Sequence, residues 1–390
     1  MTRTPHLVGW AHTPFGKSAH PDVESLMSEV SLAAVADAGL SPSDVDAVYV
    51  GVFNGGFSSQ IFESALVGAG HPELALAPAT RVENACSTGS AALYTAMDAI
   101  EAGRARAVLV IGAEKMTGVS GTRVGEILFG ASHLATESHL GSFPGVFAHL
   151  ADQYAERYGD PHESMAAIAA KNHKNGVSNP FAQMRRDLGV EFCSNPSEKN
   201  PVVAGRLLRT DCSLVSDGAA AVVVTTEDVA RTARRSVSVR ARAHASDHLR
   251  LAARDDQLEL AGAARAFRSA LQEASLSLED IDLLETHDCF TIAELLQYEA
   301  FGLAEPGKGA EVLASGMTQR DGSLPTNVSG GLKAKGHPIG ATGVSQHVLT
   351  AMQLTGEAGD MQLGRAERAA VFNMGGAAVA NYATILEQTR

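Results

Sequence analysis

Apolar and polar residues follow two different periods along the first third of the chain. Short apolar runs at residues 6–10, 45–51 and 104–112 have the length and composition of buried β-strands. Between them, residues 23–38 and 87–101 repeat apolar positions with the period of a helix. Strands that alternate with helices are typical of an α/β fold, so we expect a largely parallel sheet covered by helices.

The pattern changes between about residues 114 and 212. Glycines, prolines, basic residues and short helical pieces such as residues 164–172 replace the regular alternation. A glycine turn and a buried strand at residues 217–224 then restore it, and it continues to the C-terminus. We therefore expect an inserted loop domain at approximately residues 114–212.

Two pairs of segments resemble each other across the chain. Residues 40–48 and 276–284 share one pattern, in which each segment follows an alanine-rich helix and leads into a strand. Residues 104–112 and 365–375 are both strands that follow a helix. Any two βα units share some of these features, but the two pairs together favour a duplicated α/β fold.

The chain has 390 residues, which is long for a single core and fits two halves. We expect an N-terminal half at residues 1–231, which includes the loop domain, and a C-terminal half at residues 232–390. Its composition, 45% hydrophobic and 19% charged with 38 glycines, is typical of an α/β enzyme with many tight turns. The active site is expected where the halves meet.

The net charge of −13 argues against nonspecific binding to nucleic acid or to an anionic membrane, because both require a basic face. No apolar stretch reaches the roughly 20 residues that span a bilayer, and the N-terminus lacks the apolar core of a signal peptide. The four cysteines have no CxxC spacing and are too few for a disulfide framework. We therefore expect a cytoplasmic protein with reduced thiols.

Cys86 lies where an apolar strand stops and a helix of small residues begins. Its sulfur is expected at a helix N-terminus, where free backbone N–H groups and the helix dipole stabilise a thiolate. The small residues at 87–92 leave space for a long acyl substrate. A lone cysteine is more often a small buried hydrophobic residue, so the prediction of a nucleophile depends on partners elsewhere in the chain.

A second reactive segment covers residues 327–343, where His337 is held between Gly336 and Pro338. A histidine constrained in this way can serve as a base or as a hydrogen-bond donor near a thiol. The glycine spacing imitates part of a P-loop. His337 and Pro338 replace the required lysine and the required Ser or Thr, which excludes a nucleoside triphosphatase.

His287 and Cys289 follow a predicted strand at residues 281–284. Alternate residues of a strand point the same way, so both side chains are expected on one face unless a turn intervenes. The pair could ligate a metal ion, but no second Cys or His pair with zinc spacing accompanies it. No metal site is therefore expected.

Four segments together resemble the thiolase superfamily over nearly the whole chain. They are Asn-Ala-Cys-Ser at 84–87, Ser-Asp-Gly-Ala-Ala-Ala at 216–221, His-Asp-Cys-Phe at 287–290 and the Gly-His-Pro segment at 327–343. The His-Asp-Cys-Phe sequence is similar to the branch of the sterol-carrier-protein-X thiolase domain and archaeal acetoacetyl-CoA thiolases. Most other thiolases place their second catalytic cysteine near the C-terminus, where this chain has Asn373.

The resemblance implies two duplicated halves in a five-layered α/β/α/β/α core, a loop domain that binds coenzyme A, and a homodimer or homotetramer. It implies an enzyme that cleaves 3-ketoacyl-CoA with CoA, or condenses acetyl-CoA in reverse, through an acyl group on Cys86. CoA thioesters are then substrates, and no permanently bound cofactor is expected. Some members of the branch pair with a small zinc-ribbon/OB-fold accessory protein, which is a possible partner here.

The same resemblance assigns the catalytic roles. Cys86 attacks the substrate after His337 has helped to generate its thiolate, and Cys289 donates or removes the proton of the acetyl-CoA enolate. His337 and a water held near His287 stabilise this enolate. The backbone N–H groups of Cys86 and Gly375 form the second oxyanion hole.

Basic residues of the loop domain are the candidates for contact with the CoA phosphates, as a cluster and not one by one. They are Lys171, Lys174, Arg185, Arg186, Lys199, Arg206 and Arg209. The remaining cysteines, Cys193 and Cys212, are expected to be structural.

Other classes of function stay open beside the thiolase. A ketosynthase or a hydroxymethylglutaryl-CoA-synthase-like condensing enzyme needs a Cys-His-His or Cys-His-Asn set, which His287 makes possible, although Cys289 then has no role. Retro-aldolase relatives lack the nucleophilic cysteine, so Cys86 counts against that activity. A noncatalytic thiolase-fold partner of a small OB-fold subunit would bind without turnover. The acyl-chain length and the cellular direction of the reaction do not follow from the sequence.

Overall fold

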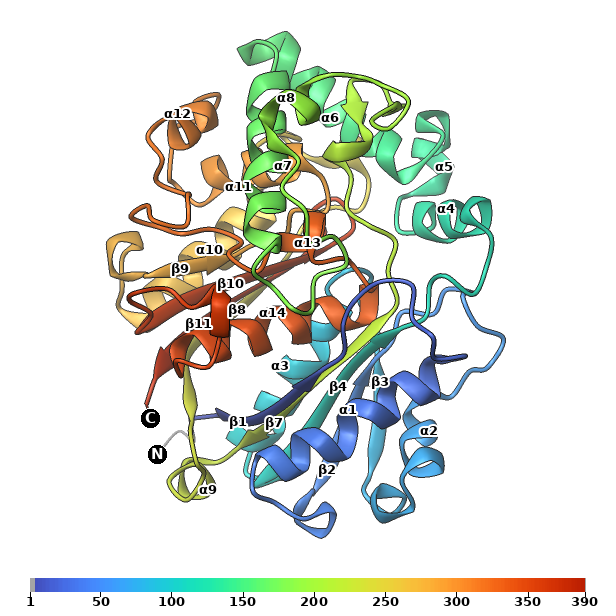
Figure 1. Ribbon diagram of the computed structural model, residues 1–390, viewed down its shortest axis with the longest axis vertical. Helices are drawn as coiled ribbons and strands as arrows, with labels where there is room; N and C mark the ends of the chain where they lie inside the picture. The colour runs from blue at the N-terminus through green and yellow to red at the C-terminus, as the bar shows by residue number, and fades with distance from the viewer. Residues whose placement is uncertain (1–3, 390) are drawn as a thin grey trace.

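The computed structural model describes residues 4–389, in which a nine-stranded mixed sheet carries helices on its faces (Figure 1). The strands of this sheet are β1 (His6–His12), β2 (Ala47–Gly51), β3 (Ala79–Val82), β4 (Ala107–Glu114), β7 (Gly218–Thr225), β8 (Val237–Ser246), β9 (Leu283–Glu285), β10 (Arg368–Gly375) and β11 (Ala380–Gln388). A separate small sheet pairs β5 (Val202–Ala204) with β6 (Leu207–Leu208).

The large sheet consists of two half-sheets with the same strand order and directions. In the first, β3-β2-β4-β7-β1, β2 is parallel to β4, and β7 is antiparallel to both β4 and β1. In the second, β9-β10-β11-β8, β9 is parallel to β10, and β11 is antiparallel to both β10 and β8. The second half has no full strand that corresponds to β3 among the described residues. In its place, Thr326 forms a single parallel bridge with Leu284 of β9. The repeated order confirms the predicted duplication.

The similar segments before β2 and β9 also share their local structure. Each contains a serine whose backbone N–H donates at 2.8 Å to the carboxylate of the aspartate three residues later, Ser41 to Asp44 and Ser277 to Asp280. Each aspartate closes a short 3-10 helix from which the chain enters the strand. The predicted repeat is therefore present at the level of single hydrogen bonds.

The helices form three layers around the half-sheets (Figure 1). The central layer contains α3 (Thr88–Glu101) and α14 (Ile339–Leu354), since α14 contacts β4 and β7 of the first half-sheet and β10 and β11 of the second. The outer face of the first half-sheet carries α1 (Val23–Asp37) and α2 (Glu63–Gly70), and that of the second carries α10 (Ala261–Ala274). The order of layers is α/β/α/β/α, as the resemblance implied.

The two central helices cross at glycines. A Cβ atom at Gly89 would lie 2.8 Å from the backbone nitrogen of Val344, and one at Gly343 would lie 2.3 Å from that of Ser90. Neither position has room for a side chain, so the two backbones are in direct contact. Because both crossing points lie near the helix N-termini, the residues that precede α3 and α14 are brought to one region of the molecule.

The expectation of a largely parallel sheet is wrong. Among the described strands of the large sheet, β2–β3, β2–β4 and β9–β10 are the parallel pairs, and the other neighbours are antiparallel. The chain reaches β7 only after the whole insertion, and β10 turns directly into β11 at residues 376–379. Helical crossovers of the βαβ kind join parallel neighbours, whereas these two connections join antiparallel neighbours, β4 with β7 and β10 with β11.

The insertion between β4 and β7 is mostly helical. It contains α4 (Gly121–Phe129), α5 (Leu134–Glu137), α6 (Phe143–Tyr158), α7 (His162–Gly176) and α8 (Gly189–Ser194). These helices lie in the upper half of Figure 1, as do α11 (Thr291–Ala300), α12 (Gly309–Ala314) and α13 (Gly331–Ala334). A short helix, α9 (Glu227–Ala230), follows β7. Within residues 4–389, none of the helices has the length and hydropathy needed to cross a membrane. The domain boundaries stay predictions.

Candidate active site

Cys86 lies in a tight turn between β3 and α3. Ala85 has a positive φ of 48°, which a residue with a side chain rarely adopts. The carbonyl of Asn84 accepts a hydrogen bond from the backbone N–H of Ser87 at 3.1 Å, and the hydroxyl of Thr88 donates to the carbonyl of Ala85 at 2.6 Å. The turn holds Cys86 at the start of α3, which agrees with its predicted position.

The thiol of Cys86 is neutral, contrary to the low pKa expected at a helix N-terminus. Burial raises the pKa of Cys86 to about 12, and Glu83 and Glu114 act in the same direction. The backbone N–H groups of Gly376 and of Cys86 itself lower the pKa, but by less than burial raises it. Cys86 therefore needs a base before its sulfur can attack.

The backbone N–H group of Gly376 lowers the pKa of Cys86, so a donor from the C-terminal half lies beside this thiol, one residue after the predicted Gly375, whose own role stays a prediction. Gly375 ends β10, and a Cβ atom there would lie 2.6 Å from the carbonyl oxygen of Asn84. The missing side chain lets β10 approach the turn that carries Cys86. The next residue, Gly376, has a φ of 62° and presents its N–H to the sulfur.

His337 lies directly before α14 and is a neutral ring with a free lone pair. Its Nδ1 is 2.7 Å from the hydroxyl oxygen of Thr342, and that hydroxyl donates its own hydrogen to the carbonyl of Pro338 at 2.9 Å. Since a hydroxyl has one hydrogen, Nδ1 of His337 must be the donor. Burial, assisted by Lys335, lowers the pKa of His337 to about 3. Its buried Nε2, which has no hydrogen-bond partner among the described residues, is the basic nitrogen.

His287 follows β9 and has the opposite tautomer. The Nδ2 amide of Asn373 donates to Nδ1 of His287 at 2.8 Å and to the carbonyl of Cys86 at 3.2 Å. Because a carbonyl only accepts, this orientation of the Asn373 amide is fixed, and the hydroxyl of Ser90 donates to its Oδ1 at 2.8 Å. The proton of His287 is therefore on Nε2. Burial lowers the pKa of His287 well below its ordinary value, so this ring is also neutral.

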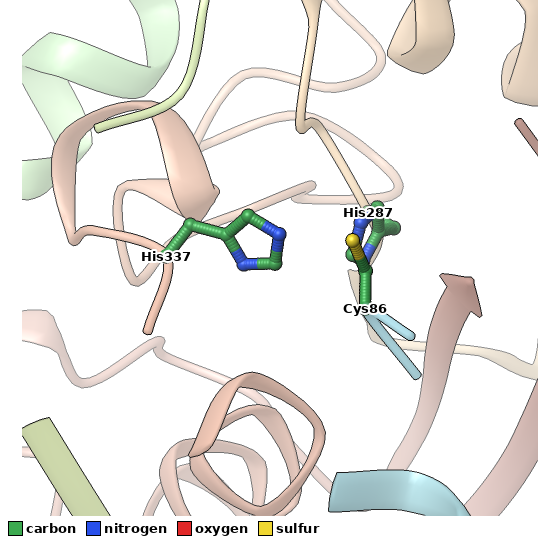
Figure 2. A group of neighbouring side chains, drawn as sticks. All are labelled: Cys86, His287 and His337. Carbon is green, nitrogen blue, oxygen red and sulfur yellow. The ribbon is translucent and has the colours of Figure 1, made fainter. Parts of the chain in front are cut away.

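Cys86, His287 and His337 meet from three separate segments of the chain (Figure 2). One side-chain atom of each lies within 4.8 Å of the other two, and the centroids of the imidazole rings are 5.2 Å apart. The group therefore combines a thiol with a basic nitrogen on His337 and an N–H donor on His287. It can remove a proton from sulfur and donate a hydrogen bond to an oxyanion.

The same three side chains include ligand types that bind zinc. A histidine that ligates a metal ion needs a lone pair at the ligating nitrogen, whereas Asn373 leaves a proton on Nε2 of His287. The donor set therefore fits acid–base chemistry better than metal binding. The expected absence of a metal stays a prediction.

Cys289 lies on the wall of the same site, but not in a strand. β9 ends at Glu285, and residues 286–289 form neither helix nor strand, so the expected alternation does not apply to them. Burial raises the pKa of Cys289 well above its ordinary value, and the nearby Cys86 and Asp288 add to this effect. Cys289 and Cys86 line one cavity, and both thiols are neutral.

The cavity beside Cys86 has a volume of about 250 Å³. Its wall combines Cys86, Cys289 and His337 with apolar residues from α4, α6 and the segment before β7. Cys212 also lines this cavity and is half-buried, and its structural role stays a prediction. Cys193 is buried in another cluster, with alanines of α7.

Three buried carboxylates, which the sequence analysis missed, hold the segment around His337. Glu285 is the last residue of β9, and Asp288 follows it by three residues. Glu114 is the last residue of β4. They accept hydrogen bonds from the backbone N–H groups of residues 329, 332, 333 and 340, at 2.6 to 3.1 Å. Asn373 was noted only as a missing cysteine. Its polar side chain in the apolar sequence of β10 was the signal for a buried role.

The structure removes Lys171 from the candidate phosphate contacts. Its buried Nζ lies 2.7 Å from the carboxylate of Glu294 and donates to the carbonyl of Thr326 at 2.9 Å. Arg206 forms ion pairs with Asp152 and Asp160. The other candidates are exposed: Lys174, Arg185, Arg186, Lys199 and Arg209.

Two family models match the chain. The model "Thiolase, N-terminal domain" matches residues 6–194, and "Thiolase C-terminal domain-like" matches residues 243–388.

The chain is also similar to known proteins over nearly its whole length. The acetyl-CoA acetyltransferase of Methanothermobacter thermautotrophicus is 39% identical over 373 residues, which cover 95% of this chain and 96% of that protein. Sterol carrier protein 2 of Homo sapiens is 33% identical over 394 residues, which cover 95% of this chain and 69% of that protein.

Solved structures share the fold. The structure titled "Ltp2-ChsH2(DUF35) aldolase" superposes with a TM-score of 0.81 at 22% identity and covers 100% of this chain and 99% of that chain. Human mitochondrial 3-ketoacyl-CoA thiolase in complex with CoA has a TM-score of 0.73 at 21% identity, with coverages of 100% and 98%. At these identities the likeness concerns the fold alone.

Proposed function

The chain belongs to the thiolase family, and we propose that it transfers acyl groups to and from coenzyme A through Cys86. It is an acyl-CoA acyltransferase that cleaves a 3-ketoacyl-CoA with CoA or condenses acetyl-CoA in reverse. The observation that carries the proposal is the meeting of a buried thiol, a basic His337 and a second thiol, Cys289, at one cavity. CoA enters as a substrate and not as a resident cofactor.

His337 is the base of the first step. Its Nε2 takes the proton of Cys86 while the sulfur attacks the keto carbon of the substrate. The keto oxygen becomes negative and accepts hydrogen bonds from the backbone N–H groups of Cys86 and Gly376, which already face the sulfur. The bond between the keto carbon and the α-carbon then breaks, which leaves the acyl group on Cys86 and releases the enolate of acetyl-CoA.

His287 and Cys289 act on this enolate. Its oxygen accepts hydrogen bonds from Nε2–H of His287 and from His337, which now carries the proton of Cys86. Burial keeps Cys289 protonated until the enolate forms, and its proton then completes acetyl-CoA at the α-carbon.

The second half-reaction restores both thiols. An incoming CoA thiol gives its proton to the Cys289 thiolate while its sulfur attacks the acyl group on Cys86. His337 returns its proton to the departing Cys86 thiolate, and the acyl group leaves as a new CoA thioester. Both cysteines are thiols again at the end of the cycle.

A Cys-His-His condensing enzyme is the second candidate, because Cys86, His287 and His337 form such a set. In that enzyme Cys289 has no chemical role. A noncatalytic scaffold would leave the whole arrangement unused. The position of Cys289 on the cavity wall favours the thiolase.

We propose the remaining properties on the same basis. The exposed basic residues Lys174, Arg185, Arg186, Lys199 and Arg209 contact the CoA phosphates as a cluster. The protein is a cytoplasmic homodimer or homotetramer. The fold shared with the Ltp2-ChsH2(DUF35) aldolase supports testing a small OB-fold accessory protein as a partner.

The test of the proposed function follows free CoA thiol and the acylated residue together. The purified protein should consume CoA thiol when it is given acetoacetyl-CoA, and peptide mapping after incubation with acetyl-CoA should place the acetyl group on Cys86. Cys193→Ala, which removes a thiol outside the cavity, serves as the control and should retain both properties. Absence of CoA consumption, or acylation of Cys212 in place of Cys86, contradicts the proposal.

A further inference from the structure

One face of α4 lines the cavity beside Cys86. The lining residues of this helix recur at helical spacing and are Gly121, Val124, Gly125 and Leu128. Outside this face, Arg123 and Glu126 form an ion pair at 3.0 Å. α4 is therefore an amphipathic helix whose apolar face borders a cavity.

The backbone of α4 does not require its two cavity-lining glycines. Neither Gly121 nor Gly125 has a positive φ, and a Cβ atom at either position would meet no other heavy atom within 4 Å. Glycine is less favourable than alanine at an exposed helix position, because it loses more backbone entropy. Gly125 therefore weakens the helix, and both glycines leave open space at the mouth of the cavity.

The cavity is apolar from α4 to the catalytic thiols. Apart from the cysteines and His337, Ser213 is the only one of the described lining residues with a polar side chain. Phe290 forms part of the wall and is held by stacking on Phe147, with ring centroids 4.3 Å apart. At the catalytic end, the unpartnered Nε2 of His337 marks where the reacting group lies.

We propose that this cavity is an acyl-chain channel, and that the preferred substrates are 3-ketoacyl-CoA thioesters whose apolar chain is longer than that of acetoacetyl-CoA. This inference rests on the proposed acyltransferase function. A volume of about 250 Å³ equals that of about eight water molecules at roughly 30 Å³ each, which is more than an acetyl group on Cys86 would fill. The chain runs from Cys86 along the glycine face of α4 towards the mouth of the cavity.

The test compares acetoacetyl-CoA with 3-ketooctanoyl-CoA in the complete protein. Gly125→Leu places a large side chain in the open space at the mouth, and Gly125→Ala places a small one there. Thr122→Leu is the matched control, because Thr122 is an exposed residue of the same helix that does not line the cavity. Circular dichroism reports whether each variant is folded.

We expect kcat/KM for 3-ketooctanoyl-CoA to fall by about tenfold or more in Gly125→Leu, by less in Gly125→Ala, and not at all in Thr122→Leu. The value for acetoacetyl-CoA should fall by less than that for 3-ketooctanoyl-CoA in both Gly125 variants, and it should stay within about twofold in Thr122→Leu. An equal loss for both substrates would assign the glycine face to the CoA arm and overturn the proposal. Unchanged values for both substrates would overturn it too.

The unaltered protein separates this inference from the function on which it rests. Cleavage of acetoacetyl-CoA without cleavage of 3-ketooctanoyl-CoA overturns the acyl-chain channel and leaves the acyltransferase function intact. Cleavage of neither substrate refutes that function itself.

Discussion

The side-chain amide of Asn373 donates a hydrogen bond to Nδ1 of His287 at 2.8 Å. Because the same amide also donates to the carbonyl of Cys86, its orientation is fixed and the proton of His287 lies on Nε2. His337 instead carries its proton on Nδ1, which donates to the hydroxyl of Thr342. Two neutral histidines beside one thiol therefore have different capacities, since one donates a hydrogen bond and the other accepts a proton.

Asn373→Asp should make enolate formation depend on pH. A carboxylate at this position can only accept, so Nδ1 of His287 must carry a proton, and Nε2 keeps a proton only in the imidazolium. The negative charge raises the pKa of His287, and the donor at Nε2 is lost as the pH rises through that value. Above it, exchange of acetyl methyl protons with deuterated water should be slower than in the unaltered protein by about 10²-fold.

The unaltered protein is the reference for this pH profile, because its His287 is neutral and keeps Nε2–H. Parallel profiles for the two proteins would refute the assigned tautomer of His287. The double variant Asn373→Asp/His287→Ala should lose little beyond His287→Ala alone, since both changes act on one donor.

Thr342→Val should slow acylation and not enolate chemistry. The valine cannot accept a hydrogen bond from Nδ1 of His337, so the proton of this ring can move to Nε2. That nitrogen must be unprotonated to accept the proton of Cys86. We expect single-turnover acetylation of Cys86 by acetyl-CoA to slow by about tenfold, at the low end of general-base effects. Thr342→Ser keeps the hydroxyl and should restore the rate. Equal rates in the valine and serine variants would contradict the role given to Thr342.

Alkylation of Cys86 by iodoacetamide should rise with pH without a plateau between about pH 7 and about pH 10. Burial raises the pKa of this thiol to about 12, so its thiolate fraction increases about tenfold for each pH unit below that value. His337, with a pKa of about 3, is neutral throughout this range and adds no inflection. Peptide mapping separates Cys86 from the other thiols. A rate that is already constant near pH 7 would show a preformed thiolate.

The sequence predicted the local parts of the site better than their chemistry. A strand end and a small-residue helix placed Cys86 at a helix N-terminus, and the Gly-His-Pro segment singled out His337, because these signals are short-range. The pKa of Cys86 did not follow, since burial by distant residues outweighs the effect of the helix terminus. The contact between Asn373 and His287 joins positions 86 residues apart, and it depends on how β9 and β10 pair.

The same distinction holds for the fold. The repeated segments before β2 and β9 were visible because each is built from neighbouring residues. The antiparallel pairing of β7 with β4 could not be predicted from the sequence, since it depends on where the chain returns to the sheet after a long insertion. The buried ion pair of Lys171 shows why a count of basic residues misidentifies phosphate ligands, because composition does not distinguish the interior from the surface.

Lys171→Met should destabilise the fold without weakening CoA binding. The change leaves the buried carboxylate of Glu294 without its ion-pair partner, and removal of one member of such a pair typically costs about 3–5 kcal/mol. Urea denaturation measures this loss, and KM for CoA should not change in the folded variant. Arg185→Glu is the surface control and should have little effect on stability. A large increase of KM in Lys171→Met at normal stability would return Lys171 to the phosphate site.

Cys289→Ala tests the central claim, that two cysteines divide acyl transfer and enolate chemistry between them. Exchange of the acetyl methyl protons of acetyl-CoA with deuterated water reports enolate formation, and acetylation of Cys86 reports acyl transfer. The account predicts a folded variant that still acetylates Cys86 and has lost methyl exchange, because Cys289 is the group that moves the proton at the α-carbon. Methyl exchange at the rate of the unaltered protein in a folded Cys289→Ala variant would contradict the two-cysteine mechanism and leave His337 as the sole base.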